Sequence, residues 1–368
     1  MTLGEGQVTI GHGRLVELMT ACFAGVGLSP GDASAVATVL ADANLHGIDS
    51  HGVERAPIYM SRVTRGLARG TDAVTTLLDA GPICRIDAGH ALGPAVSTQA
   101  TDRAIEMARV HGMGLVTVGR STHFGAAGFY ARRAAAAGMA ALVASNAPAT
   151  MAPHGGAERF LGANPLAIGL PVGRHGEFVL DMSTSVIARG RIRRAEALGE
   201  SLPPGVALDT DGNPTLDAAA ALAGCVLPVG GPKGSGLAMA ISLLVGFLAG
   251  ADFDDEMESM YSGFDRPHNI GHLFWVVDPS GFADQRTATL RAESLIDRLH
   301  AIGPAYAGGD VMFAGERQSA VARRRLAEGI PIAAGELRRL ADAARDCHRP
   351  DIAGLIDELV AAPAEPVS

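Results

Sequence analysis

The sequence contains few aromatic residues and few cysteines. Tryptophan, tyrosine and phenylalanine make up only 4% of the 368 residues, while 48% are hydrophobic and 47 are glycine. We therefore expect a core filled by alanine, valine and leucine, with many tight turns. The four cysteines, Cys22, Cys84, Cys225 and Cys347, lie far apart. This spacing argues against a disulfide framework or a zinc knuckle and favours a reducing cytoplasm.

Positive charge is also scarce. A formal net charge of -9 argues against nucleic acid or an anionic membrane as the partner. The first ten residues, MTLGEGQVTI, lack the basic start and long apolar core of a secretory signal. Residues 234–251 carry no charge and are long enough to cross a membrane, but they include four glycines and two serines. We expect a helix buried on all sides of a large soluble, cytoplasmic protein.

The hydrophobic pattern indicates an α/β protein. The first eighty residues look helical, and short apolar runs at 115–118, 140–145, 166–172, 178–181 and 273–277 are typical of buried strands. A helix over 126–137 joins the first two strands, and helices return at about 286–300, 317–328, 334–346 and 351–361. We expect a helical N-terminal part (1–80) and a mixed-sheet domain for cofactor and substrate (81–285). A helical C-terminal part (286–368) would pack against the N-terminal one.

The segment from His46 to Arg55 is the most informative stretch of the chain. If it is helical from His51 onward, His51, Arg55 and Tyr59 share one face. Histidine exchanges a proton near neutral pH, and arginine holds a carboxylate with two parallel hydrogen bonds. This combination suits a small acid whose adjacent carbon changes oxidation state. A solvated surface loop would contain the same residues.

Further polar loops follow predicted strands. His123 lies in the loop after the strand at 115–118, a position that ligands of α/β sheets favour. Asp181 is followed by hydroxyl side chains. Residues 228–236 form a glycine-rich turn with Lys233 at the start of the apolar helix, which suits a phosphate. The spacing matches neither a Walker A loop nor a Gly-x-Gly-x-x-Gly fingerprint. Taken singly, the glycine-rich turn is equally compatible with a purely structural role, and His123 and Asp181 each favour a structural role.

Together, these segments resemble the malate/L-lactate dehydrogenase-like family of NAD(P)-dependent oxidoreductases. That family includes sulfolactate, ureidoglycolate and diketogulonate-type enzymes and a cyclic-imine carboxylate reductase. The matching pieces are Asp49-Ser50-His51-Gly52-x-x-Arg55, His123-Phe124-Gly125, Gly162-Ala163-Asn164-Pro165, Asp181-Met182-Ser183-Thr184-Ser185, Pro232-Lys233-Gly234 and Gly315-Glu316. The family binds its nicotinamide cofactor without a Rossmann fingerprint, so the resemblance implies NAD or NADP here. It also implies a homodimer.

The resemblance implies a role for each matching residue. His51 would be the proton donor to the substrate carbonyl, tuned by Ser50 and Asp181. Arg55, Tyr59 and His123 would lie on the substrate side, with His123 as a further catalytic candidate. The implied cofactor contacts are Asn164, Phe178, Asp181, Ser183, Ser185, Pro232, Lys233, Gly315, Glu316 and Arg317. Ala314 replaces a proline that is frequent before the Gly315-Glu316 pair, which suggests a different cofactor contact there. His154 replaces a frequent tryptophan, which suggests a differently shaped pocket.

The sequence therefore predicts an oxidoreductase that moves hydride between NAD(P)H and the α-carbon of a small 2-oxo or 2-hydroxy acid. A reductase of a cyclic imine carboxylate is the nearest alternative. A hydrolase with a Ser50, His51 and Asp181 triad is a second, although adjacent serine and histidine side chains diverge on most backbones and no Gly-x-Ser-x-Gly elbow is present. A nucleotide sensor without catalysis is a third, and it would not need the proton donor.

Overall fold

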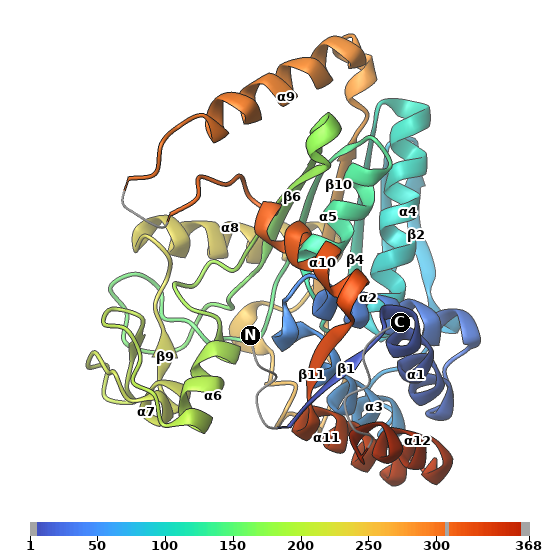
Figure 1. Ribbon diagram of the computed structural model, residues 1–368, viewed down its shortest axis with the longest axis vertical. Helices are drawn as coiled ribbons and strands as arrows, with labels where there is room; N and C mark the ends of the chain where they lie inside the picture. The colour runs from blue at the N-terminus through green and yellow to red at the C-terminus, as the bar shows by residue number, and fades with distance from the viewer. Residues whose placement is uncertain (1–5, 306–308, 362–368) are drawn as a thin grey trace.

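The computed structural model describes residues 6–305 and 309–361, and a seven-stranded mixed sheet lies at its centre (Figure 1). The strand order is β2 (Thr75–Ala80), β3 (Ile83–Asp87), β4 (Met113–Ser121), β10 (Ile270–Val277), β5 (Ala140–Ser145), β6 (Leu166–Pro171) and β7 (Glu177–Met182). Only β3 and β4 pair in parallel. The predicted mixed α/β character is confirmed, and each of the five predicted strands is present.

Helices cover both faces of this sheet. On β4, alternate residues point to opposite faces. Gly114 lies against α4 (Gly93–His111), whereas Gly119 lies against the last residue of α8 (Pro232–Ala249). Helix α5 (Ala127–Ala136) packs beside α4 and connects β4 to β5. Strand β10 lies between β4 and β5, so this predicted strand–helix–strand unit spans a strand that comes much later in the sequence.

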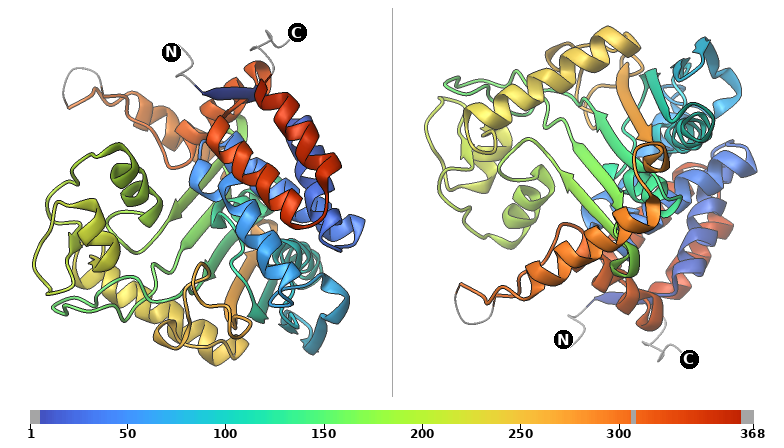
Figure 2. Two further views of the ribbon diagram at one scale, coloured as in Figure 1. Left: turned by 90° about the horizontal axis from the view of Figure 1, so that it is seen from below. Right: turned by 90° about the horizontal axis from the view of Figure 1, so that it is seen from above.

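The two ends of the chain share a second core. Helices α1 (His12–Gly25), α2 (Pro30–Leu45) and α3 (Ala56–Thr64) pack with α11 (Ala334–Asp346) and α12 (Pro350–Ala361), as Figure 2 shows from two sides. Helix α10 (Glu316–Glu328) contributes Ala322 to this cluster. Strand β1 (Gln7–Ile10) pairs with β11 (Ile330–Ala333). The prediction that the first eighty residues are helical is therefore wrong at β1 and β2.

Helix α9 (Gln285–His300) lies apart from this second core and packs on the turn η4 (Gly173–His175) (Figure 1). A smaller lobe holds α6 (Arg189–Leu198), α7 (Ala218–Ala223), β8 (Ala207–Leu208) and β9 (Cys225–Val226). The remaining short helical turns are η1 (Asp49–His51), η2 (Val53–Arg55), η3 (Thr71–Ala73), η5 (Asp254–Glu256) and η6 (Pro279–Gly281).

Helix α8 is long and apolar enough to cross a membrane, but one of its faces packs on the sheet. The other face exposes Met239, Leu243, Leu244, Phe247 and Leu248, with Phe247 75% exposed. The prediction that this helix is buried on all sides is therefore wrong, because the sheet covers only one side of it.

Candidate active site

The segment around His51 forms two helical turns. Residues 49–51 and 53–55 are separate 3₁₀ turns, and α3 begins only at Ala56. Gly52 separates the turns with a ψ of -136°. The continuous helix from His51 under which the three side chains would share one face is therefore not formed, although the three side chains still reach a common site.

Asn44 holds this segment in place from helix α2. Its side-chain oxygen accepts a hydrogen bond of 2.8 Å from the Val53 N–H, and its amide donates to Asp49 at 3.0 Å. A Cβ atom on Gly52 would lie 1.9 Å from the Asn44 Oδ1. Only glycine therefore fits between the two turns. Arg325 of α10 forms an ion pair of 2.7 Å with Asp49, which ties the segment to the C-terminal part of the chain.

His51, Tyr59 and His123 meet in this site. The His51 and His123 rings stack with centroids 5.6 Å apart, and the Tyr59 hydroxyl lies 2.6 Å from His123 Nδ1. The Gly125 N–H also donates to this nitrogen, at 3.3 Å. Burial holds the pKa of His123 well below its usual value, with further lowering from the Arg55 charge and from His51 whenever that ring is protonated, and burial raises the pKa of Tyr59. His123 is therefore neutral, with its proton on Nε2.

Ser50 contacts His51 directly. Its hydroxyl lies 3.0 Å from His51 Nδ1. The expectation that these adjacent side chains diverge is wrong, because the tight turn η1 brings them to one side. Burial, and to a lesser extent the Arg55 charge, lower the pKa of His51 to about 3. The free protein therefore holds a neutral His51 whose Nε2 has no hydrogen-bond partner in the described part of the chain.

Arg55 is a buried cation without a counter-ion. It is only 7% exposed, and its Nε donates to the Ser50 carbonyl at 2.7 Å. Within residues 6–305 and 309–361, no carboxylate lies within ion-pair distance of it. A buried, unpaired charge is unfavourable. An anionic ligand bound to the terminal nitrogens of Arg55 would remove this penalty.

Asp181 does not contact His51. Its carboxylate accepts a hydrogen bond of 2.8 Å from the Gly128 N–H in the first turn of α5, and burial raises its pKa. A Cβ on Gly128 would lie 2.7 Å from the Asp181 Oδ2. Asp181 thus fixes the start of the helix that follows the His123 loop. The Ser50, His51 and Asp181 side chains do not assemble as a hydrolytic triad.

Two of the predicted cofactor segments lie together after strand β7. The Val229 N–H donates to the Thr184 carbonyl at 2.9 Å, and a Cβ on Gly234 would lie 2.7 Å from this same carbonyl oxygen. The Ser183 and Ser185 hydroxyls are 3.0 Å apart. Asp181 to Ser185 and Pro228 to Gly234 therefore form one surface.

The start of helix α8 differs from the predicted phosphate site. The N–H groups of Lys233 and Gly234 donate to the Gly230 and Val229 carbonyls, at 3.4 and 2.9 Å, so they are not free for an anion. The Lys233 side chain follows Pro232 at the first turn and is exposed. Its ammonium group is the part of this turn that remains suited to a phosphate.

The third predicted cofactor segment covers the edge strand β7. The Val179 N–H donates to the Ala314 carbonyl at 2.9 Å, Gly315 lies against Val179 with a φ of 93°, and Phe178 stacks on Phe313 at 6.4 Å. Glu316 accepts hydrogen bonds from the Phe313 N–H (3.1 Å) and is paired with His300 Nε2 (3.0 Å).

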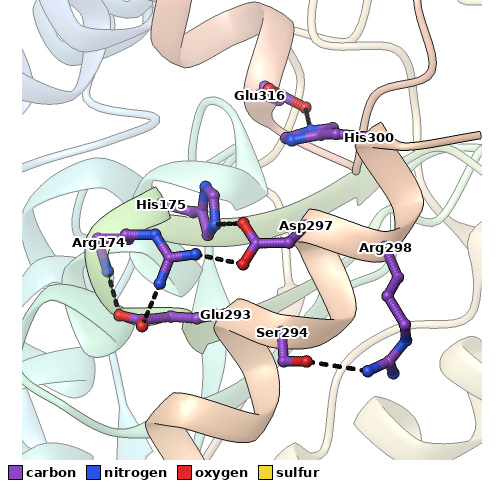
Figure 3. A network of polar contacts seen from close by, with 8 residues as sticks. All are labelled: Arg174, His175, Glu293, Ser294, Asp297, Arg298, His300 and Glu316. Atoms are coloured by element: carbon purple, nitrogen blue, oxygen red, sulfur yellow. Dashed lines mark hydrogen bonds and ion pairs between the residues drawn. The ribbon is translucent and has the colours of Figure 1, made fainter.

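Figure 3 shows the polar network around His300. Arg174 and His175 contact Asp297 of α9, and Arg174 also pairs with Glu293. These contacts fix α9 beside Glu316, whose carboxylate is already engaged by protein. The next residue, Arg317, is exposed.

Asn164 is completely buried. Its oxygen accepts from the Ala147 N–H at 3.0 Å, and its amide donates to the Ala238 carbonyl at 2.8 Å and to Asp254 at 2.7 Å. Because its polar groups are engaged by the protein, Asn164 positions these loops and is not available to a cofactor.

Known proteins with similar sequences identify the family of this chain. A model of a family described as malate/L-lactate dehydrogenase matches residues 10–341. The chain belongs to the malate/L-lactate dehydrogenase family. It is therefore an oxidoreductase of a family of NAD(P)-dependent 2-hydroxy acid dehydrogenases.

Several members of the malate/L-lactate dehydrogenase family are similar to most of this chain. L-sulfolactate dehydrogenase of Methanothermobacter thermautotrophicus is 37% identical over 84% of this chain and 89% of its own. (2R)-3-sulfolactate dehydrogenase (NADP(+)) of Chromohalobacter salexigens is 38% identical over 73% and 80%. Ureidoglycolate dehydrogenase (NAD(+)) of Escherichia coli is 33% identical over 83% and 87%. Relatives of this chain therefore use either cofactor.

Solved structures agree with this assignment to the family. The sulfolactate dehydrogenase of Methanocaldococcus jannaschii superposes with a TM-score of 0.85 and 31% identity, over 92% of this chain and 97% of that one. The delta1-piperideine-2-carboxylate reductase of Pseudomonas syringae superposes with a TM-score of 0.83 and 32% identity, over 91% and 99%.

Three residues near the site, His272, Tyr261 and Arg193, were not predicted from the sequence. His272 of β10 is fully buried between the Ser121 and Ser145 hydroxyls, at 2.9 and 2.8 Å, and stacks in parallel on Phe124 at 4.6 Å. It thereby supports the loop that carries His123. A histidine within an apolar strand was the available signal. Tyr261 and Arg193, which lie near Arg55, have no such signal in the sequence.

Proposed function

We propose that this protein interconverts a small 2-hydroxy acid and its 2-oxo acid, with His51 as the proton-transferring group and Arg55 as the carboxylate-binding group. The observation that carries the proposal is the buried Arg55, without a counter-ion, beside the neutral His51. One residue binds an anion and its neighbour accepts a proton, which are the two functions that oxidation of a 2-hydroxy acid requires.

The terminal nitrogens of Arg55 would hold the substrate carboxylate with two parallel hydrogen bonds. This would place the adjacent carbon near the stacked His51 and His123 rings, 5.6 Å apart. In oxidation, His51 Nε2 accepts the hydroxyl proton while the Ser50 hydroxyl holds Nδ1. His123, kept neutral with its proton on Nε2, donates a hydrogen bond to the substrate oxygen. The nicotinamide cofactor, when bound, accepts or supplies the hydride.

Reduction requires a protonated His51. The Arg55 charge is one of the two causes of the low pKa of His51. A substrate carboxylate that pairs with Arg55 offsets this charge, so substrate binding raises the pKa of His51 and favours uptake of the proton. Substrate binding and proton uptake would therefore be coupled.

The residues along β7 fit a nicotinamide dinucleotide. The Lys233 ammonium suits a phosphate, and the Ser183 hydroxyl suits a polar group of the ligand. Ser185 is only 5% exposed and donates to the Ile187 carbonyl at 2.9 Å, so it positions this loop. Phe178, Pro232 and Gly315 supply the neighbouring wall, with Glu316 and Arg317 at its end. A Cβ on Gly234 would meet the Val229 and Thr184 carbonyls at 2.4 and 2.7 Å, so a glycine here lets the start of α8 pack closely on the segment that follows β7. We propose NAD or NADP as the cofactor.

A reductase of a cyclic imine carboxylate is the second candidate. The relative from Pseudomonas syringae, which is 32% identical, carries this activity in its name. The same two residues would serve it, since an imine carboxylate also offers a carboxylate to Arg55 and a basic atom to His51. A set of substrates that includes both classes separates the two candidates.

We further propose a cytoplasmic homodimer. The exposed apolar face of α8, from Met239 to Leu248, is the feature that supports a second copy as partner.

The direct test is a substrate screen with both cofactors. NADH binding is followed by quenching of the fluorescence of Trp275, the single tryptophan of the chain, which is 44% exposed. Turnover of 2-oxo acids, 2-hydroxy acids and cyclic imine carboxylates is then measured as the loss or formation of NAD(P)H. We expect turnover of a 2-oxo acid with at least one cofactor. Turnover of the imines alone would favour the second candidate, and cofactor binding without any turnover would indicate a sensor.

A further inference from the structure

We propose that Arg193 is a specificity-determining residue that binds a second anionic group of the substrate. The substrate would then be a 2-hydroxy acid with another acid group at the far end of a three- or four-carbon skeleton. This inference rests on the proposed function, since it assumes that Arg55 binds the carboxylate next to the reacting carbon.

Helix α6 lies directly against the catalytic segment. A Cβ on Gly190, in its first turn, would lie 2.9 Å from the Cβ of Ser50. Arg193 follows Gly190 by three residues, so both lie on the same face of the helix. The glycine permits this close approach, and the arginine one turn later extends along the site.

Tyr261 brings the two arginines together. The guanidinium carbon of Arg193 lies 4.3 Å from the centre of the Tyr261 ring, and that of Arg55 lies 5.7 Å from the same centre. The two guanidinium carbons are therefore within about 10 Å of each other. In the proposed complex, one short diacid would place one acid group on each guanidinium.

The loop that carries Tyr261 is fixed from helix α3. Arg62, which is 1% exposed, donates from NH1 to the Gly263 carbonyl at 2.9 Å and to the Met260 carbonyl at 3.4 Å. The ring position therefore depends on a buried contact to the helix that follows Arg55, and the spacing of the two arginines is part of the fold.

Neither arginine has a counter-ion in the described residues. Arg55 has only its Nε bond to the Ser50 carbonyl, and Arg193 forms no hydrogen bond or ion pair with any described side chain. Arg132 and Arg325, by contrast, each pair with an aspartate at 2.9 and 2.7 Å. Two neighbouring unpaired cations repel each other. A single anion satisfies Arg55, and a second anionic group on the same molecule would satisfy Arg193.

The alternative is that Arg193 only packs on Tyr261. A cation–π contact between the half-buried Arg193 and Tyr261 stabilises the fold only modestly. Such a role would make Arg193 equally important for every substrate. The two roles therefore differ in substrate dependence.

The experiment compares oxaloacetate with 2-oxobutyrate, which have the same number of carbons but two and one acid groups. Neither has a stereocentre at the reacting carbon, so the comparison does not depend on which enantiomer of the product is formed. We measure kcat/KM for the wild type, Arg193→Gln and the control Arg194→Gln. Arg194 is exposed on the same helix. Thermal unfolding and NADH titration verify that each variant folds and binds cofactor.

We expect the wild type to prefer oxaloacetate. Arg193→Gln should lower kcat/KM for oxaloacetate about ten- to hundredfold, as expected for loss of a charge-assisted hydrogen bond, and change the value for 2-oxobutyrate less than about twofold. Arg194→Gln should change neither. Equal losses for both acids, or a wild type without preference, would overturn the role of Arg193 while the proposed function stands. A wild type that reduces no 2-oxo acid with either cofactor would overturn the proposed function and this inference with it.

Discussion

Replacing Arg55 with lysine tests the carboxylate-binding site while keeping its charge. Arginine presents a planar fork that matches a carboxylate, whereas lysine presents a single ammonium group. The variant should lose one of two charge-assisted hydrogen bonds to the substrate, about 1.5–3 kcal/mol. We therefore expect the KM for a 2-oxo acid to rise about ten- to hundredfold, since 1.4 kcal/mol is a factor of ten.

The same substitution removes a structural contact. The Arg55 Nε donates to the Ser50 carbonyl at 2.7 Å, and lysine has no equivalent of this group. A bond of this kind is worth about 1.5–3 kcal/mol, so the melting temperature should fall by several degrees. This loss of stability does not by itself predict a change in the affinity for NAD(P)H, which distinguishes substrate binding from general damage.

The assay is steady-state reduction of the best 2-oxo acid, with KM and kcat determined separately, together with a fluorescence titration of NADH. Arg65→Lys is the matched control. Arg55 directly precedes helix α3, and Arg65 directly follows it. Arg65 is exposed and stacks on Phe264 at 4.4 Å, so its replacement by lysine tests the same substitution away from the substrate. A wild-type KM in Arg55→Lys would refute the assignment and leave Arg55 a structural residue.

Two further substitutions test the cofactor surface and the catalytic segment. Lys233→Ala should weaken NAD(P)H binding roughly ten- to hundredfold with the fold intact, and an unchanged affinity in a titration would remove Lys233 from the site. Gly52→Ala should lower both the melting temperature and kcat, because its Cβ would lie 1.9 Å from the Asn44 Oδ1 and displace the bond to Val53. Gly13→Ala, which meets nothing within 4 Å, is the control, and equal behaviour of the two variants would contradict this account of the turn.

The buried strands could be predicted from the sequence because their side chains pack on both faces. Residues 140–145 form β5 with the predicted bounds, since this apolar run lies in the middle of the sheet. Strand β2 carried no such signal, because all six of its residues are exposed at the edge. Strand β1 is stabilised by β11, more than 300 residues later in the chain, and local pattern does not report such a partner.

The site was predictable where a residue type determines the chemistry. His51, Arg55, Tyr59 and His123 do come together. The means by which they meet was not predictable, because the break at Gly52 depends on the side chain of Asn44. Arg193 belongs to a helix with four arginines and resembles any solvated helix in sequence. Only its position beside Tyr261 distinguishes it from its neighbours.

The central claim is that His51 transfers the proton, and the pH dependence of the reaction in both directions tests it most directly. Because burial and Arg55 lower the pKa of the free His51 to about 3, the base is already deprotonated at neutral pH. The kcat/KM of oxidation should therefore be independent of this group from about pH 5 upward. The kcat/KM of reduction should fall about tenfold per pH unit as the protonated form becomes scarcer.

The decisive measurement is the reduction of the best 2-oxo acid by His51→Asn across pH, at saturating NAD(P)H, with His123→Asn as the matched variant. General acid–base catalysis contributes about 10²–10⁴-fold. We expect kcat/KM of His51→Asn to fall by this factor and to lose its decline with pH, while NADH still binds. His123→Asn should keep the decline. A near-normal kcat/KM with an unmoved pH profile in His51→Asn would contradict the account and assign proton transfer to His123.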